Sequence, residues 1–337
     1  MTPFSNTTGR MKKLLDYFWP VVGLGAVVAS FYLLYHEFQG ESVGADVWAA
    51  LKAIPSGHYA LAAASTLLAY AALAWYDRIA LLHLGVTHIS WLFISVCSFT
   101  TYALSHNIGA SVFSGAMVRY RAYTSKGLTA AQVAILVVIC SYTFAFGNVL
   151  LGGLLLTWDP ALMQRLSGFL PDIFTNPSAA LTVGLACLAG VAIYLIGSLQ
   201  QLKIFKIGRF NIIFPRSEIA FRQLFAAPLE LVGAAGIIYF ALPEAGNPGF
   251  LVVLGAFLLS FSAALVSHAP GGLGVFELLF IKIMPDVPRV KVLAALLVWR
   301  LFYLIIPLLV GILVVLFFER GKLAEKLRGD GSADAQG

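Results

Sequence analysis

The sequence contains little charge and little cysteine. Charged residues occupy 11% of its 337 positions, whereas soluble domains carry roughly one quarter. This scarcity excludes an ordinary water-soluble domain. The three cysteines, Cys97, Cys140 and Cys187, lie in apolar stretches without CxxC spacing, so we expect small core residues rather than disulfides.

Motifs of soluble enzymes are also missing. The chain has no Walker loop, no dinucleotide GxGxxG, no HExxH and no GxSxG. ATP-driven transport by this chain alone is therefore not expected, and no catalytic residue is assigned. The six histidines lack ligand spacing apart from the weak pair His83 and His88, so no metal and no cofactor are predicted.

Long apolar runs are the dominant feature of the chain. Apolar residues make up 60% of it, and a membrane crossing needs roughly 20 of them in succession. The predicted fold class is all-α, a polytopic membrane helix bundle that forms one domain over 1–318, followed by a charged tail over 319–337. The apolar runs are 19–38, 58–76, 91–113, 130–158, 178–199, 221–242, 250–267 and 290–318.

One motif occurs twice, which suggests an internal repeat. Each copy continues into glycine and Val-Phe, then into a basic link and a long apolar run, so the copies are placed at about 58–158 and 220–318. Chance similarity between apolar stretches is the alternative. Repeats of this kind are typical of transport proteins. In each copy a Ser-Phe pair is followed, at the same spacing, by a Ser-His pair. These are Ser98-Phe99 and Ser105-His106 in the first copy, and Ser260-Phe261 and Ser267-His268 in the second.

The positive-inside rule predicts how the copies are oriented. If each Ser-His segment enters and leaves on one side, the basic links around 119–126 and 203–222 both fall in the cytoplasm. We therefore predict about six spanning helices plus two re-entrant segments as an inverted repeat, with eight full spans as the alternative. Both termini are then cytoplasmic, in a bacterial inner membrane. Lys282, Arg289 and Lys291 do not fit this pattern.

Both re-entrant segments contain glycine, with a Pro-Gly-Gly-Leu-Gly cluster in the second. Irregular backbone at membrane depth requires protein or a water-filled cavity around it, so Pro270, Gly271, Gly272, Gly274 and Gly109 are expected to border such a cavity. A following helix N-terminus suits an anionic group such as a phosphodiester. Close helix packing is the alternative use of these glycines.

Ionisable residues inside apolar segments are candidate binding groups, because each costs roughly 3 kcal/mol at the bilayer centre. Arg300 lies near mid-depth of the last run, with Glu277 and Glu230 as expected counter-charges. A buried pair that only fixes helix register is the alternative. The histidines could relay protons or simply pack. The remaining candidate substrate-binding residues are Ser105, His106, Asn107, Ser267, His268 and, at the cytoplasmic interface, Arg119 and Arg121.

Two segments carry a resemblance to a known family. Residues 98–109 with Arg119-Tyr120-Arg121, and the run Ala269-Pro270-Gly271-Gly272-Leu273-Gly274-Val275-Phe276-Glu277, resemble the transmembrane region of lysylphosphatidylglycerol synthase/flippase proteins and their stand-alone relatives, the UPF0104 family. The bifunctional members add a soluble aminoacyltransferase domain after this region. Since the sequence stops at Gly337, the resemblance implies lipid translocation without lipid aminoacylation.

The predicted function is therefore flippase-like translocation of an anionic or aminoacylated phospholipid. A non-transporting partner of a separate lipid-modifying enzyme and an intramembrane lipid-modifying enzyme are the alternatives. The expected partners are membrane phospholipids, and nucleic acid is not expected, because the excess of six positive charges is read as topology and anionic-lipid contact.

Overall fold

The computed structural model describes residues 28, 32, 35, 43–108, 111–167, 171–202, 205–207, 210–212 and 214–318. Five helices within these ranges are long and apolar enough to cross a membrane, which confirms the predicted polytopic helix bundle. Two predicted segments lie outside the described residues. These are the tail, 319–337, and the expected first span, 19–38, of which only three positions are described. The five are α3 (Ser56–His83), α6 (Ala130–Trp158), α8 (Pro177–Leu199), α9 (Ser217–Ala241) and the helix Arg289–Phe318, which begins as α12 (Arg289–Trp299).

Polar side chains cap the starts of α6 and α8. The side chain of Thr129 accepts a hydrogen bond from the Gln132 backbone N–H (3.3 Å), and Gln132 Oε1 accepts one from the Thr129 N–H (2.9 Å), which forms a capping box before α6. α8 begins at Pro177, and the preceding Asn176 side chain accepts from the Ser178 N–H (2.9 Å).

Shorter elements join the spans. α2 (Val43–Ala53) precedes α3, and η1 (Pro160–Leu166) and α7 (Asp172–Thr175) connect α6 to α8. Two antiparallel strands, β1 (Phe205–Ile207) and β2 (Phe210–Ile212), connect α8 to α9, with Phe205 opposite Ile212. Apart from this small β-hairpin, the described residues form helices and their connections, so the predicted all-α class is confirmed.

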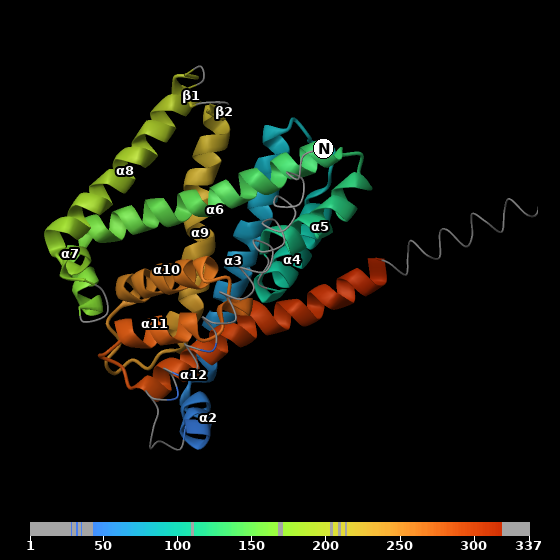
Figure 1. Cartoon of the computed structure of the whole chain (residues 1–337). Helices are drawn as coiled ribbons and strands as arrows, with labels where there is room; N and C mark the ends of the chain where they lie inside the picture. The colour runs from blue at the N-terminus through green and yellow to red at the C-terminus, as the bar shows by residue number, and fades with distance from the viewer. Residues whose placement is uncertain are drawn as a thin grey trace, which may run out of the picture.

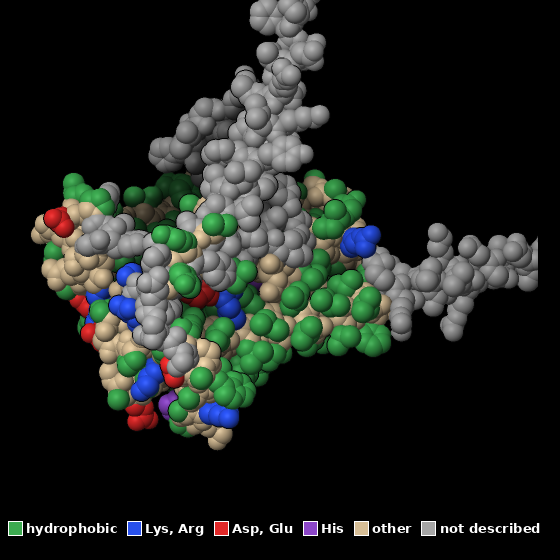
Figure 2. Space-filling model, turned by 60° about the horizontal axis from the view of Figure 1, so that its bottom comes forward, with side chains coloured by type: hydrophobic (Ala, Val, Ile, Leu, Met, Phe, Trp, Pro, Cys, Tyr) green, Lys and Arg blue, Asp and Glu red, His purple; other side chains and the backbone are tan. Residues whose placement is uncertain are grey.

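α3 and α9 form the centre of the bundle and run antiparallel (Figure 1). At one end, Arg216 Nη2 donates to the Leu82 carbonyl over 2.8 Å, which joins the start of α9 to the end of α3. At the other, His58 Nδ1 lies 2.8 Å from the Phe240 carbonyl oxygen. We call these the basic end, marked by Arg216, and the mixed end, marked by His58. Figure 2 turns the mixed end forward and shows basic and acidic side chains interspersed there.

The first Ser-His segment is a helical hairpin that we call hairpin 1. It consists of α4 (Trp91–Ile108) and α5 (Ser111–Thr124), which pack against each other. Its two ends lie together, because His88 Nε2 is 3.2 Å from the Lys126 carbonyl oxygen. Since α4 follows closely on the end of α3, hairpin 1 enters the bundle from the basic end (Figure 1).

The second Ser-His segment, hairpin 2, enters from the mixed end. It consists of α10 (Phe250–Val266), the short turn η2 (Pro270–Gly272) and α11 (Val275–Ile283), and α10 follows the end of α9. A Cβ placed on Gly246, before α10, would lie 2.8 Å from the carbonyl oxygen of Asp286, after α11. Within the described residues, both hairpins therefore return to the end they came from, in opposite directions, as in the predicted inverted arrangement.

The tips of the two hairpins meet inside the bundle. A Cβ on Gly271 would lie 3.9 Å and 4.0 Å from the carbonyl oxygens of Asn107 and His106. Two cavities, of about 360 and about 320 Å³, lie at the mixed and basic ends, and neither is lined by tip residues. The expected cavity bordered by Pro270, Gly271, Gly272, Gly274 and Gly109 is not one of these two and stays a prediction.

Candidate functional site

Arg300 lies where hairpin 2 meets the last helix. Its guanidinium forms an ion pair with Glu277 of α11, and its Nη1 donates to the Gly271 carbonyl oxygen over 3.0 Å. The two charged side chains are only 11% and 9% exposed. Because an isolated charge at membrane depth is expensive, the carboxylate and the carbonyl together stabilise the guanidinium.

Glycine conformation makes this contact possible. Gly271, Gly272 and Gly274 have φ of 59°, 66° and 81°, in the left-handed region that residues with a Cβ avoid. The Gly274 N–H donates to Glu277 Oε2 over 2.8 Å, so this carboxylate caps α11 while its other oxygen faces Arg300. The Pro-Gly-Gly-Leu-Gly run therefore brings one carbonyl and one carboxylate to the same guanidinium.

The last helix changes its winding at this site. Residues Arg300–Ile305 (η3) are π-helical, a conformation that is frequent at functional sites. Two carbonyl oxygens of this segment accept hydrogen bonds from side chains of other helices. Tyr70 Oη donates to the Tyr303 carbonyl (3.0 Å), and Asn107 Nδ2 donates to the Leu304 carbonyl (3.2 Å). The π segment is thereby tied to α3 and to the tip of hairpin 1.

Tyr303 brings together three polar side chains near the tips. The rings of His106 and Trp299 stack on it, each with a centroid distance of 5.3 Å, and its hydroxyl donates to Glu230 Oε1. Three buried atoms around it, His106 Nδ1, Trp299 Nε1 and Glu230 Oε2, have no hydrogen-bond partner among the described residues. Buried polar atoms usually have partners, so these are the atoms best placed to meet a polar ligand or water.

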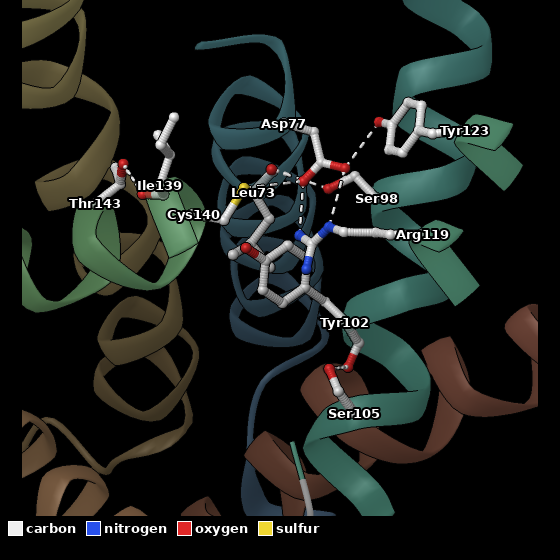
Figure 3. Close-up of polar contacts among 10 residues, drawn as sticks. All are labelled: Leu73, Asp77, Ser98, Tyr102, Ser105, Arg119, Tyr123, Ile139, Cys140 and Thr143. Atoms are coloured by element: carbon white, nitrogen blue, oxygen red, sulfur yellow. Dashed lines mark hydrogen bonds and ion pairs between the residues drawn. The ribbon is translucent and has the colours of Figure 1, made fainter. Parts of the chain in front are cut away.

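A second buried ion pair joins α3 to α5 (Figure 3). Arg119 donates to Asp77 through Nη2 (2.6 Å) and Nε (3.3 Å). Tyr123 Oη and Cys140 Sγ donate to the same carboxylate over 2.8 and 3.4 Å. The Tyr102 ring covers the guanidinium at 4.8 Å. Asp77 thus receives about as many donors as a carboxylate can accept, and both charged side chains are at most 5% exposed.

No family model matches the chain. It is 31% identical over 289 residues to Uncharacterized protein slr0712 of Synechocystis sp., a match that covers 86% of this chain and 85% of the relative. The chain belongs to the slr0712 family. Inner membrane protein YbhN of Escherichia coli is 28% identical over 244 residues, which cover 71% of this chain and 73% of YbhN.

Shorter matches link this slr0712-family chain to larger proteins. Phosphatidylglycerol lysyltransferase of Staphylococcus haemolyticus is 35% identical over 100 residues, and that of Bacillus subtilis is 32% identical over 108 residues. The matches cover 29% and 31% of this chain but only 12% of each relative. The resemblance to the lysylphosphatidylglycerol synthase region is thus supported over part of the chain.

The structure brings together several of the predicted site residues of the slr0712-family chain. His106 and Asn107 of hairpin 1 meet the Gly271 turn of hairpin 2, where Glu277 and Arg300 pair. Pro270 begins the same turn, and Gly272 and Gly274 continue it.

Other predicted residues lie elsewhere or differ in their contacts. Ser105 is buried in α4, and Ser267 bonds within its own turn, to the Ala264 carbonyl. His268 is exposed, with φ of 54°, and Arg121 is exposed near the end of α5. Gly109 lies outside the described residues.

Two expectations about charge are corrected. Arg119 does not present its guanidinium to lipid phosphate at the interface, because Asp77 holds it in the interior and only 4% of the residue is exposed. Glu230 does not pair with Arg300, because Arg300 is paired with Glu277 and Glu230 is bonded to Tyr303.

Sequence reasoning missed Asp77 and Tyr303. Asp77 directly follows the predicted apolar run 58–76, whereas in the structure α3 continues to His83 and buries it. Two features of the sequence could have indicated a buried ion pair. Asp77 lies next to an apolar run, and an arginine is present at position 119. Tyr303 gave no signal, because a tyrosine in an apolar helix is ordinary.

Proposed function

We propose that this protein moves a phospholipid between the leaflets of a bacterial inner membrane. Arg300 is the observation that carries the proposal. It is an almost buried cation, 11% exposed, held by Glu277 and by the glycine turn of a hairpin that meets an oppositely directed hairpin. The partial matches to phosphatidylglycerol lysyltransferases support a phospholipid as the substrate.

The chemistry of this pair suits a charged headgroup. A lipid phosphate competes with Glu277 for the guanidinium, because arginine binds phosphate oxygens in the same forked geometry as a carboxylate. An ammonium group on an aminoacylated headgroup would then form an ion pair with the released Glu277 carboxylate. The unpartnered atoms of His106, Trp299 and Glu230 supply further polar contacts. Anionic and aminoacylated phospholipids are accordingly the proposed substrates.

The charges of the links support a sidedness for this movement. Lys126, Arg216 and Arg222 lie at the basic end, whereas the mixed end carries Arg165 and Lys291 beside the acidic Glu244 and Asp286. By the positive-inside rule the basic end faces the cytoplasm. The same proposal includes two cytoplasmic termini and an internal repeat with copies at about 58–158 and 220–318. It also includes membership of the stand-alone UPF0104 relatives.

Proteoliposomes test the proposal. The purified chain is reconstituted with labelled phosphatidylglycerol, lysylphosphatidylglycerol or phosphatidylethanolamine, and movement between leaflets is measured. We expect faster movement than in protein-free vesicles for at least one of these lipids. Arg300→Ala and Glu277→Ala should slow it by about tenfold or more, the equivalent of one lost charged hydrogen bond.

Arg165→Ala is the matched control, because Arg165 also pairs with a carboxylate, Asp286, but at the partly exposed mixed end. It should leave the rate unchanged. The absence of acceleration for every headgroup would reject translocation. A chemically altered lipid recovered from the vesicles would instead support an intramembrane lipid-modifying enzyme.

A further inference from the structure

We propose that a pocket at the basic end binds the phosphate of a phospholipid headgroup, as the docking site from which lipid reaches the hairpin tips. Trp75, Arg78, Ile89, Trp91 and Arg222 line this pocket, whose volume is about 320 Å³. The docking role rests on the proposed translocation. The phosphate binding itself depends only on the pocket.

The two arginines give the pocket its chemistry. Arg78 is partly buried, yet it forms no hydrogen bond or ion pair with any residue that the structure describes. Arg222 uses Nη2 to donate to Glu218 Oε1 over 2.6 Å, and its other nitrogens donate to no residue in the described part of the chain. Two guanidinium groups, one without a counter-charge, favour an anion with several oxygens.

The surroundings favour a lipid as the source of that anion. Trp75 and Trp91 line the same pocket, and Trp91 is 52% exposed. Tryptophan is enriched at the level of lipid headgroups, where its ring contacts acyl chains and its N–H contacts polar groups. Because a water molecule occupies about 30 Å³ in the liquid, the cavity is also larger than a single ion requires.

The opposite pocket, of about 360 Å³, supplies an internal comparison. The basic-end pocket is built from the end of α3, the link into hairpin 1 and the start of α9. The other is built from the end of α9, the link into hairpin 2 and the start of α3, together with α2 and α12. The two therefore occupy equivalent places in the inverted arrangement.

Their linings differ in charge. The mixed-end pocket contains Lys291 and His58, but also Glu244, whose Oε1 lies 3.9 Å from His58 Nε2. A carboxylate beside the ligand repels phosphate, whereas none of the described residues that line the basic-end pocket is acidic, and Glu218, outside this lining, is paired with Arg222. Phosphate binding is accordingly assigned to the basic end alone.

Binding to the full-length protein in detergent tests the assignment. Phosphatidylglycerol with brominated acyl chains is titrated while tryptophan fluorescence is recorded, because bromine quenches nearby indole rings. Diacylglycerol with the same chains is the phosphate-free probe. We expect phosphatidylglycerol to quench saturably and diacylglycerol to do so only weakly. Arg78→Gln should weaken phosphatidylglycerol binding about tenfold, and Arg78→Lys should restore part of it.

Lys126→Gln is the matched control, since Lys126 is an exposed cation at the same end but outside the pocket. It should bind as the wild type does, and Arg78→Gln should keep the wild-type unfolding temperature because Arg78 has no partner to lose among the described residues. Equal binding by wild type and Arg78→Gln would overturn the site.

Two further readouts separate the possible explanations. If inorganic phosphate or glycerophosphoglycerol competes as strongly as the lipid, the site takes a soluble phosphate and the lipid assignment is overturned. If phosphatidylglycerol binds through Arg78 while proteoliposomes show no translocation, the binding site stands and the proposed function fails.

Discussion

Asp77–Arg119 and Glu277–Arg300 are both buried arginine–carboxylate pairs, but their surroundings differ. Asp77 accepts four hydrogen bonds from three side chains, all of which belong to helices other than its own. Its side chain is 0% exposed. Glu277 serves one backbone N–H and Arg300, and Arg300 also binds a carbonyl in a glycine turn. The first pair lies between a central helix and hairpin 1, and the second lies at the tip of hairpin 2.

This difference separates a structural role from a binding role. A carboxylate whose acceptor sites are all used cannot bind a ligand without losing native contacts. Arg300, by contrast, is held by a carbonyl and a single carboxylate, which a phosphate could replace. We therefore expect the Asp77 pair to control stability and the Glu277 pair to control lipid movement.

The largest effect is expected for Asp77→Asn. The substitution leaves Arg119 buried without a counter-charge, and breaking a buried pair in this way typically lowers the free energy of unfolding by about 3–5 kcal/mol. Denaturant or thermal unfolding in detergent measures the loss. The double variant Asp77→Leu with Arg119→Met should recover most of it, because an apolar pair of similar size avoids the unpaired charge. Equal instability of single and double variants would contradict this explanation.

A smaller loss of stability is expected for Glu277→Gln. The amide can still accept from the Gly274 N–H, and Arg300 keeps the Gly271 carbonyl, so about 1–3 kcal/mol is expected. The same unfolding measurement, made beside the proteoliposome assay, should find lipid movement more strongly impaired than stability. A destabilisation as large as that of Asp77→Asn would erase the distinction between the two pairs.

A still smaller loss, about 1–2 kcal/mol, is expected for Gly272→Ala. The residue has φ of 66°, and an added Cβ would lie 2.9 Å from the Ala264 Cβ. Gly190→Ala is the control, since no atom of the described residues lies within 4 Å of a Cβ there. Unfolding measurements should find the control neutral or slightly stabilised, because alanine favours helix. A neutral Gly272→Ala would mean that the turn does not need its left-handed backbone.

Labelling variants should change stability least, by no more than about 0.5 kcal/mol. Ser125→Cys lies at the base of hairpin 1 and Ala245→Cys before hairpin 2, both at exposed positions. Cys97 and Cys140 are buried, and partly exposed Cys187 is replaced by alanine in the background. A membrane-impermeant thiol reagent should reach the two new cysteines from opposite sides of the membrane. Labelling of both from one side would exclude the inverted arrangement.

Much of the fold could be predicted from the sequence, because a bilayer imposes a simple requirement on composition. Each apolar run had to form a helix so that its backbone hydrogen bonds were made internally. The repeated Ser-His motif indicated two related segments, and in the structure both are hairpins. The glycine run indicated irregular backbone, and three left-handed glycines occur there.

The partners of the charged groups required the tertiary structure. Arg119 and Asp77 are 42 positions apart, and Glu230 and Tyr303 are 73 apart, so no local pattern joins them. Composition thus determined that the chain is a membrane helix bundle, because solvent preference is a property of each residue alone. Which arginine is enclosed and which meets the hairpin tips was decided by the packing of helices, because a buried charge is stabilised by whatever donors and acceptors the fold brings within hydrogen-bond distance.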